Sequence, residues 1–206
     1  MRDDAYATAA DYRAAITPDR DNGDDVAIGE DLTAVSRYLE HPGRLGRWFN
    51  RDTAVVDRIY TIKWPGQTLE IDDLAELAPA PAIQIDAEPD GLFELTLDPA
   101  DYELLRYDAR QGPDPWPYTE INLPVWRSKS FTRNARVKVS GWWGWPAVPV
   151  AVKVATVRLT SMLRLESAWA TRRLPEGMDQ AIETSMDAQI LLRTLANGYA
   201  KRWVLV

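Results

Sequence analysis

The sequence predicts an α+β protein in which N- and C-terminal helices pack as a helical bundle around an inserted antiparallel β-module, a small sandwich or barrel. Apolar side chains recur at helical spacing near both ends of the chain, whereas the middle carries short β-branched and aromatic runs separated by turn signals. Neither helical end can bury its apolar side alone, so we expect the two ends to pack together. The expected parts are N-terminal helices in residues 1–52, the β-module in 53–140, C-terminal helices completing the bundle in 141–198, and a C-terminal tail in 199–206.

Two helices are expected in the N-terminal part. Residues 3–16 have alanines on one side and end at Thr17-Pro18. Residues 25–40 follow with apolar residues at near-helical spacing, and His41-Pro42-Gly43 ends this second helix. His41 is the one histidine of the chain, and we interpret it as a helix-end residue whose positive form suits the helix dipole.

Short strands are expected in the middle of the chain, over residues 54–62, 69–71, 83–86, 93–97, 102–105, 120–123 and 136–140. Residues 64–67 form a turn, and Asp72 to Leu74 leave the second strand. Pro89-Asp90-Gly91 indicates a hairpin. This succession of short strands is typical of an antiparallel sandwich or barrel.

Helices are expected again after Gly141. Residues 148–172 show a narrow polar stripe, which indicates a helix buried on several sides, and the segment 174–177 breaks it. The last helix is expected over 186–196, with Ser185 as N-cap and Asn197-Gly198 as the stop.

The composition excludes several function classes. The 206 residues, 46% of them apolar, suffice for a core, and the absence of cysteine excludes disulfide scaffolds, zinc–thiolate sites and thiol catalysis. One histidine leaves no His-based triad or multi-histidine metal site. No apolar run reaches the roughly 18 residues that a membrane span needs, and the acidic N-terminus is no signal peptide. The composition favours a protein that works by contact.

Charge is unevenly distributed along the chain. Residues 1–124 contain 11 Lys and Arg against 26 Asp and Glu, whereas residues 125–206 contain 13 against 5. Two faces of the protein could meet different partners, or copies could stack acidic face to basic face. The alternative is that each half is simply solvated.

Two acidic motifs are candidates for a calcium site and for an acid–base site. Asp19, Asp21 and Glu30 stand at calcium-loop positions, but the glycine falls one residue early and one ligand is missing, so a solvated loop is the better interpretation. Asp72 and Asp73 could pair for acid–base chemistry, but neighbours in a strand point to opposite faces. We therefore expect no catalytic residues, no metal site and no cofactor.

Nine tryptophans are the most unusual feature of the composition. Exposed tryptophans would suggest a sugar platform or a protein interface, whereas buried ones would fill the core. We interpret one cluster as a structural hinge between strand and helix, made of Gly141, Trp142, Trp143, Gly144, Trp145 and Pro146.

Two segments are candidates for partner contacts. Residues 125–173 are rich in Lys and Arg with Glu166 as their one acid, but they lack any nucleic-acid-binding motif, so an acidic protein surface is the better partner. The apolar C-terminal tail must dock on its own domain or on another chain. Its candidate partner-binding residues are Tyr199, Lys201, Arg202, Trp203, Val204, Leu205 and Val206.

The order of several motifs resembles the head–tail connector, or adaptor, proteins of long-tailed bacteriophages and gene transfer agents. The most recognisable motif runs from Ser140 to Pro149, a strand that ends in Gly-x-x-Gly-Trp-Pro-x-x-Pro before a long helix. The other motifs are Tyr6-Ala7-Thr8, residues 32–37, Arg47-Trp48-Phe49, residues 69–74, and residues 191–199.

The resemblance implies a structural, non-enzymatic virion protein, made in the host cytoplasm and placed in the neck at the head–tail interface. Family members form a ring, usually of twelve copies, beneath the portal. The resemblance implies that the tail contacts the portal protein, that other surfaces receive a stopper or other neck protein, and that genomic DNA passes through the channel without sequence-specific binding. It implies no contact with a membrane.

Three other functions stay open on the sequence. A stopper or tail-completion protein would share the particle but usually lacks the flanking helices. A carbohydrate-binding module would use exposed tryptophans. A hydrolase would need carboxylates such as Asp72 and Asp73 to converge in a cleft.

Overall fold

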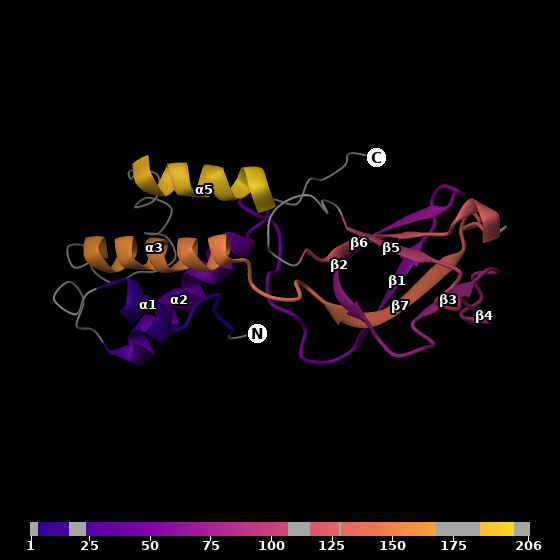
Figure 1. The fold of residues 1–206 in the computed structure, drawn as a ribbon, viewed down its shortest axis with the longest axis horizontal. Helices are drawn as coiled ribbons and strands as arrows, with labels where there is room; N and C mark the ends of the chain where they lie inside the picture. The colour runs from indigo at the N-terminus through magenta and orange to yellow at the C-terminus, as the bar shows by residue number, and fades with distance from the viewer. Residues whose placement is uncertain (1–3, 17–23, 107–115, 128, 168–185, 200–206) are drawn as a thin grey trace. The chain divides into compact units, whose positions relative to one another are not determined.

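The computed structural model describes residues 4–16, 24–106, 116–127, 129–167 and 186–199. Within these residues the protein is α+β, with four helices and an antiparallel half-barrel sheet (Figure 1). The chain divides into two compact units. The helical unit comprises residues 1–49 and 148–206, and the β-unit comprises residues 50–147.

The helical unit contains two helices from each end of the chain: α1 (Ala9–Ala15), α2 (Asp25–Glu40), α3 (Val150–Ser167) and α5 (Met186–Tyr199). Helix α2 contacts α1 and α3, and α3 also contacts α1 and α5. A buried cluster of Tyr12, Ile28, Leu32 and Val157 joins α1, α2 and α3. Segments that are distant in the sequence therefore bury their apolar sides against one another, as predicted.

Two helix ends differ from the sequence-based expectation. Helix α1 begins at Ala9 rather than near residue 3, because the Thr8 hydroxyl accepts the Asp11 N–H at 3.1 Å and the Asp11 carboxylate accepts the Thr8 N–H at 2.9 Å. Helix α5 continues through Asn197-Gly198 to Tyr199. The Tyr199 ring lies edge-on to Phe49, with ring centroids 6.1 Å apart. Such a contact favours continuing the helix past a local stop signal.

Part of the C-terminal prediction lies outside the described residues. Helix α3 is described to Ser167, and the expected extension to residue 172 and the break at 174–177 lie outside the described residues. The expected N-cap Ser185 also lies outside the described residues.

The β-unit is one antiparallel sheet with strand order β4-β3-β7-β2-β6-β5, and β1 pairs with the other edge of β7. The strands are β1 (Val56–Thr61), β2 (Thr68–Leu77), β3 (Ile83–Asp86), β4 (Leu95–Thr96), β5 (Glu103–Arg106), β6 (Tyr118–Asn122) and β7 (Arg136–Trp143). A 3₁₀ turn, η1 (Val125–Arg127), lies between β6 and β7.

Strand β7 is longer than predicted and organises the sheet. It continues past Ser140 to Trp143, and its last residues pair with β2, Gly141 opposite Leu77 and Trp143 opposite Leu74. The first half of the same edge pairs with β3, residue 139 opposite Ile83. One edge of β7 is therefore shared by two strands that follow each other in the chain.

Strand β2 was predicted to end at Ile71 but runs to Leu77. Its register with β6 shifts between Glu70 and Leu74. Ile71 and Leu74 are both buried although three positions separate them, so the irregularity at Asp72-Asp73 returns the apolar side chains to the core face. Strand β4 is shorter than predicted and retains only Leu95 and Thr96.

The sheet encloses an apolar core on its inner face. Alternate residues of β7, namely Val137, Val139, Gly141 and Trp143, are buried there. They pack with buried residues of β2, β3 and β6 and of the connections, which include Ile71, Leu74, Ile83, Ile85, Ile121, Leu123 and Phe131.

Gly141 is a position where β7 and β2 leave no room for a side chain. An added Cβ would lie 2.6 Å from the Glu76 carbonyl oxygen and 2.6 Å from Leu74 Cδ1. We expect Gly141→Ala to lower the free energy of unfolding by about 1–3 kcal/mol, because the main chain of the paired strand would have to shift. Urea denaturation followed by tryptophan fluorescence measures this change.

The matched control is Gly66→Ala, because an added Cβ at Gly66 would meet nothing within 4 Å. We expect its free energy of unfolding to stay within about 0.5 kcal/mol of the parent. Equal destabilisation by the two substitutions would contradict the close approach at Gly141.

Candidate functional site

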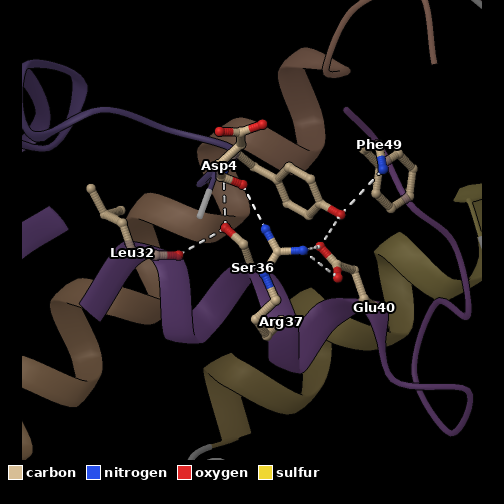
Figure 2. Close-up of polar contacts among 7 residues, drawn as sticks. Asp4, Leu32, Ser36, Arg37, Glu40 and Phe49 are labelled. Atoms are coloured by element: carbon tan, nitrogen blue, oxygen red, sulfur yellow. Dashed lines mark hydrogen bonds and ion pairs between the residues drawn. The ribbon is translucent and has the colours of Figure 1, made fainter. Parts of the chain in front are cut away.

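A buried polar cluster in the helical unit brings together three segments that are far apart in the sequence. Tyr6 comes from the segment before α1, Ser36, Arg37 and Glu40 come from α2, and Phe49 follows the loop after α2 (Figure 2). These segments carry the first three motifs of the family resemblance. The sequence singled out each motif, but only the fold shows that they meet.

The hydrogen bonds of Tyr6 hold the cluster together. Its N–H donates to Ser36 Oγ at 2.9 Å, and that hydroxyl donates to the Leu32 carbonyl oxygen at 2.8 Å. Its own hydroxyl donates to Glu40 Oε1 at 2.5 Å and accepts the Phe49 N–H at 3.1 Å (Figure 2). One side chain thus fixes the chain on both sides of α2.

Arg37 completes the cluster. Its Nη1 lies 2.6 Å from both carboxylate oxygens of Glu40, and its Nη2 donates to the Asp4 carbonyl oxygen at 2.7 Å. The guanidinium also lies over the Trp48 ring, 4.3 Å from the centroid. The motif residues Arg37 and Trp48 are therefore structural partners of one another.

Burial sets the protonation of this cluster. Burial, and next the nearby Glu40 carboxylate, raise the pKa of Tyr6 far above its ordinary value, so the phenol stays neutral and donates. Burial raises the pKa of Glu40 as well, against the opposing effects of Tyr6 and Arg37. A neutral phenol and a paired carboxylate suit positioning of the chain rather than proton transfer.

The end of α5 joins the same cluster. The Phe49 ring lies edge-on to Tyr6, with ring centroids 5.5 Å apart, and its other neighbour is Tyr199 at 6.1 Å. Tyr199 is half-buried. The rest of the predicted partner-binding tail, Lys201 to Val206, lies outside the described residues.

A groove of about 320 Å³ lies beside α5 in the helical unit. It is lined by Gly43, Arg44, Leu45, Gln189, Leu192, Arg193 and Ala196. Arg44 also lies 5.0 Å from the Tyr38 ring centroid. Two arginines among mainly apolar neighbours give the groove a positive charge, which disfavours the Lys201-Arg202 pair of the tail as its occupant.

The predicted hinge residues lie at the end of the β-unit. Gly141, Trp142 and Trp143 belong to β7, and Gly144 has a φ of 97°, which favours glycine. The Gly144 N–H donates to the Asp73 carbonyl oxygen at 2.8 Å. Pro146 is half-buried close to residue 147, where the β-unit ends. A hinge role for this segment stays a prediction.

The tryptophans of this segment fill the interior of the β-unit. Trp143 and Trp145 are fully buried, and Trp145 packs on Trp116 with ring centroids 4.8 Å apart. Trp143 Nε1 donates to the Val56 carbonyl oxygen at 2.8 Å. Trp142 is half-buried beneath the Arg51 guanidinium, 4.8 Å from its ring centroid.

The basic stretch 125–173 is partly neutralised by acids from the first part of the chain. In the helical unit, Lys153 pairs with Asp11 at 2.7 Å and Arg164 with Asp31 at 2.5 Å. In the β-unit, Arg136 pairs with Asp86 and Lys129 with Asp101, both at 2.5 Å. The uneven charge along the sequence therefore does not separate an acidic unit from a basic one. Each unit contains acidic residues from 1–124 and basic residues from 125–206.

The acidic motifs have structural partners. The Asp72 carboxylate accepts from Arg58 at 2.8 Å and from the Tyr60 hydroxyl at 3.2 Å, so it links β2 to β1. Of the calcium-loop residues, Glu30 lies on α2, whereas Asp19 and Asp21 lie outside the described residues. His41 is the C-cap of α2, at the helix end as predicted.

One acidic cluster was not singled out from the sequence. Carboxylate oxygens of Asp86, Asp90 and Glu94 lie within 4.8 Å of one another beside the β3–β4 connection. Burial disfavours the charged form of Asp86, but the Arg136 guanidinium and the Gly91 N–H outweigh it, so the pKa of Asp86 lies below its ordinary value. A cation from the chain itself already pairs with this cluster.

No model of a protein family matches the sequence, and no curated protein matches it. A solved structure described as "Neck of empty GTA particle computed with C6 symmetry" is similar to this chain, with 16% sequence identity over 98% of this chain and 93% of that chain and a TM-score of 0.46. Among the described residues, the helices are too short or too polar to cross a membrane.

The Tyr6 hydroxyl is the first group to test in the cluster. Tyr6→Phe removes the hydroxyl that accepts the Phe49 N–H and donates to the Glu40 carboxylate, so we expect the free energy of unfolding to fall by about 1–3 kcal/mol. Tyr102→Phe is the control, because among the described residues the half-buried Tyr102 hydroxyl has no hydrogen-bond partner. Equal midpoints in urea for Tyr6→Phe and the parent would contradict this role.

The Asp11–Lys153 pair predicts how acid affects the helical unit. Hydrogen bonds from Lys153 and Thr8 lower the pKa of Asp11 from 3.8 to about 2. The contribution of this group is therefore complete above about pH 4 and is lost as the pH falls through about 2. We expect Lys153→Gln to reduce the loss of stability between these pH values.

Urea unfolding at several acidic pH values measures this effect. Arg158→Gln is the matched control, because Arg158 is exposed on the same helix and makes no ion pair among the described residues. An unchanged pH dependence in Lys153→Gln would show that the pair does not set the Asp11 pKa.

Proposed function

We propose that this protein is a structural component of the neck of a phage-like particle, a head–tail adaptor that forms a ring beneath the portal. In this role it links the DNA-filled head to the next neck protein, and its function is contact rather than catalysis. The observation that carries the proposal is the convergence of the resemblance motifs in the buried cluster around Tyr6, Arg37 and Phe49.

Convergence supports the resemblance because the motifs lie apart in the sequence. Tyr6, residues 32–37 and Arg47-Trp48-Phe49 form one hydrogen-bonded and aromatic cluster, and the last motif reaches it through Tyr199. Chance similarity of four short motifs gives no reason for them to meet. A shared fold gives that reason.

The C-terminal tail is the proposed portal-binding segment. Helix α5 is anchored at its end by the Tyr199–Phe49 contact, so the residue that precedes this segment has a fixed position. This segment combines the cations Lys201 and Arg202 with the apolar run 203–206, and burial of that run on another chain would remove it from water.

The remaining partners follow from the same role. Copies of the chain form the ring, a stopper or other neck protein binds on the side away from the portal, and genomic DNA passes through the channel. The excess of acidic residues, a net charge of −7, suits passage without adhesion, because proteins hold DNA largely by neutralising its phosphates.

A carbohydrate-binding module is the second candidate, and one observation favours it. Trp64 and Trp126 have 69% and 74% of their surfaces exposed. Such rings could stack on sugars, and glycans would then quench tryptophan fluorescence. A stopper or tail-completion protein is the alternative within the particle, and its copy number and position would distinguish it from an adaptor.

The placement is tested by quantitative mass spectrometry of purified, DNA-filled particles, with the portal protein as internal standard. We expect a ratio near one to one with the portal, because a ring beneath the portal matches its size. A ratio many times higher would place the chain in the tail tube, and its absence from particles would refute a structural role.

The tail is tested by deleting residues 200–206, which leaves the Tyr199–Phe49 contact in place. We expect attachment to portal-containing heads to be lost while the urea midpoint stays unchanged, because the deletion removes only the proposed portal contact. The control carries the same tail residues in scrambled order. Unchanged attachment after the deletion would refute the tail assignment.

A further inference from the structure

The β-unit presents two exposed apolar patches whose surrounding charges have opposite sign. We define the cationic patch as Lys63, Trp64, Val125, Trp126 and Arg133, and the acidic patch as Glu88, Asp90, Leu92, Glu94 and Leu95. All ten side chains are exposed.

The cationic patch is assembled from the β1–β2 turn and the segment between β6 and β7. These two segments are joined on both sides of η1, because the Leu123 N–H donates to the Gln67 carbonyl oxygen at 2.7 Å and Gly66 forms a β-bridge with Phe131. The Arg133 guanidinium lies 6.0 Å from the Trp64 ring centroid. Two tryptophans and Val125, each about 70% exposed, therefore lie on two segments that are joined to each other.

The acidic patch lies on the β3–β4 connection, and this loop is held in one conformation. The Asp86 carboxylate accepts the N–H groups of Asp90 and Gly91 and pairs with Arg136. Leu92 and Leu95 remain 64% and 46% exposed. Apolar side chains on a fixed loop lose little conformational entropy when a partner covers them.

Neither patch has a charged side chain that forms an ion pair within the part of the chain that the structure describes, although Arg136 and Lys138 lie beside the acidic patch, against Phe93. Lys63 and Arg133 make no ion pair with a described residue, and neither do Glu88, Asp90 and Glu94. This contrasts with Lys129 and Arg136 of the same unit, which do. Each patch therefore has charged side chains without an ion pair beside exposed apolar side chains.

We propose that the two patches bind each other between copies of this chain, the cationic patch of one copy against the acidic patch of the next. Tryptophan and arginine are the residues that most often dominate binding energy at interfaces. Opposite potentials around the apolar centres would orient the contact and exclude like-charged pairings. The proposal takes its setting, a ring in the particle, from the proposed function.

A second copy is favoured over other occupants because one chain supplies both complementary surfaces. Each copy can then bind two neighbours, one through each patch, and such a contact closes into a ring where the rotation between copies permits. A nucleic acid would use the cationic patch but be repelled by the acidic one. A neutral sugar would need neither set of charges.

The absence of cysteine from the chain makes a direct test possible. Thr132→Cys places a thiol beside the cationic patch and Ala87→Cys places one beside the acidic patch, both at exposed positions. The two variants of the full chain, carrying different tags, are mixed at high concentration and treated with a short bismaleimide. We expect heterodimers to exceed homodimers of either variant severalfold, because only the mixed pair brings the two thiols to one contact.

Charge reversal separates this contact from random collision. Adding Lys63→Glu and Arg133→Glu to the Thr132→Cys chain should lower the heterodimer yield about tenfold. Adding Glu88→Lys and Glu94→Lys to its partner should then restore the yield. Unchanged urea midpoints verify that each variant folds.

Three outcomes would overturn the proposal. The first is a yield of heterodimers no higher than that of homodimers, and the second is a loss of heterodimers that charge reversal in the partner does not restore. The third is quenching of tryptophan fluorescence by a glycan or DNA in a protein that forms no heterodimers. The last result would assign the cationic patch to that ligand. The particle measurement is independent of this test. A chain found at one copy per portal without heterodimers refutes the contact alone, and heterodimers from a chain absent from particles refute the neck role alone.

Discussion

Strand β7 makes hydrogen bonds along both of its edges, and the rest of the β-unit depends on this double pairing. One edge holds β1, and the other is divided between β3 and the end of β2. Because β2 and β3 are consecutive in the chain, a single strand fixes the position of both and of the strands that pair with them. The side chain of Trp143 strengthens the arrangement, since its indole N–H donates to the backbone of β1.

The end of β7 is also where three tryptophans fill the interior of the β-unit. Trp143 and Trp145 are fully buried at the end of β7, and Trp116 packs on Trp145. A half-barrel closed over few strands leaves a wide interior to fill, and a large aromatic ring fills it with fewer side chains. Among the described residues, Trp64 and Trp126 are exposed instead, and contact with a partner supplies an explanation.

In the helical unit, the hydrogen bonds of the cluster around Tyr6 select one packing of the helices more strongly than apolar contacts do. Apolar burial favours many packings of short helices, whereas the Tyr6 hydroxyl satisfies one donor and one acceptor in a single geometry. Ion pairs between early acids and late bases, such as Asp31 with Arg164, act in the same direction. A unit with a fixed surface is what repeated assembly into a ring would require.

The sequence by itself determined the fold class, the position of each described helix and the approximate place of every strand, because periodicity and turn residues act locally. The range of α2, residues 25–40, was predicted without error, from apolar residues at near-helical spacing and the stop at His41-Pro42-Gly43. Only the tertiary structure decided the lengths of β2 and β7, which extend because each offers the other a pairing edge. It also decided which charges pair and which motifs meet, since Tyr6, Arg37 and Phe49 come together only when distant segments pack. Patterns of residues within one segment do not indicate which distant segment it will contact.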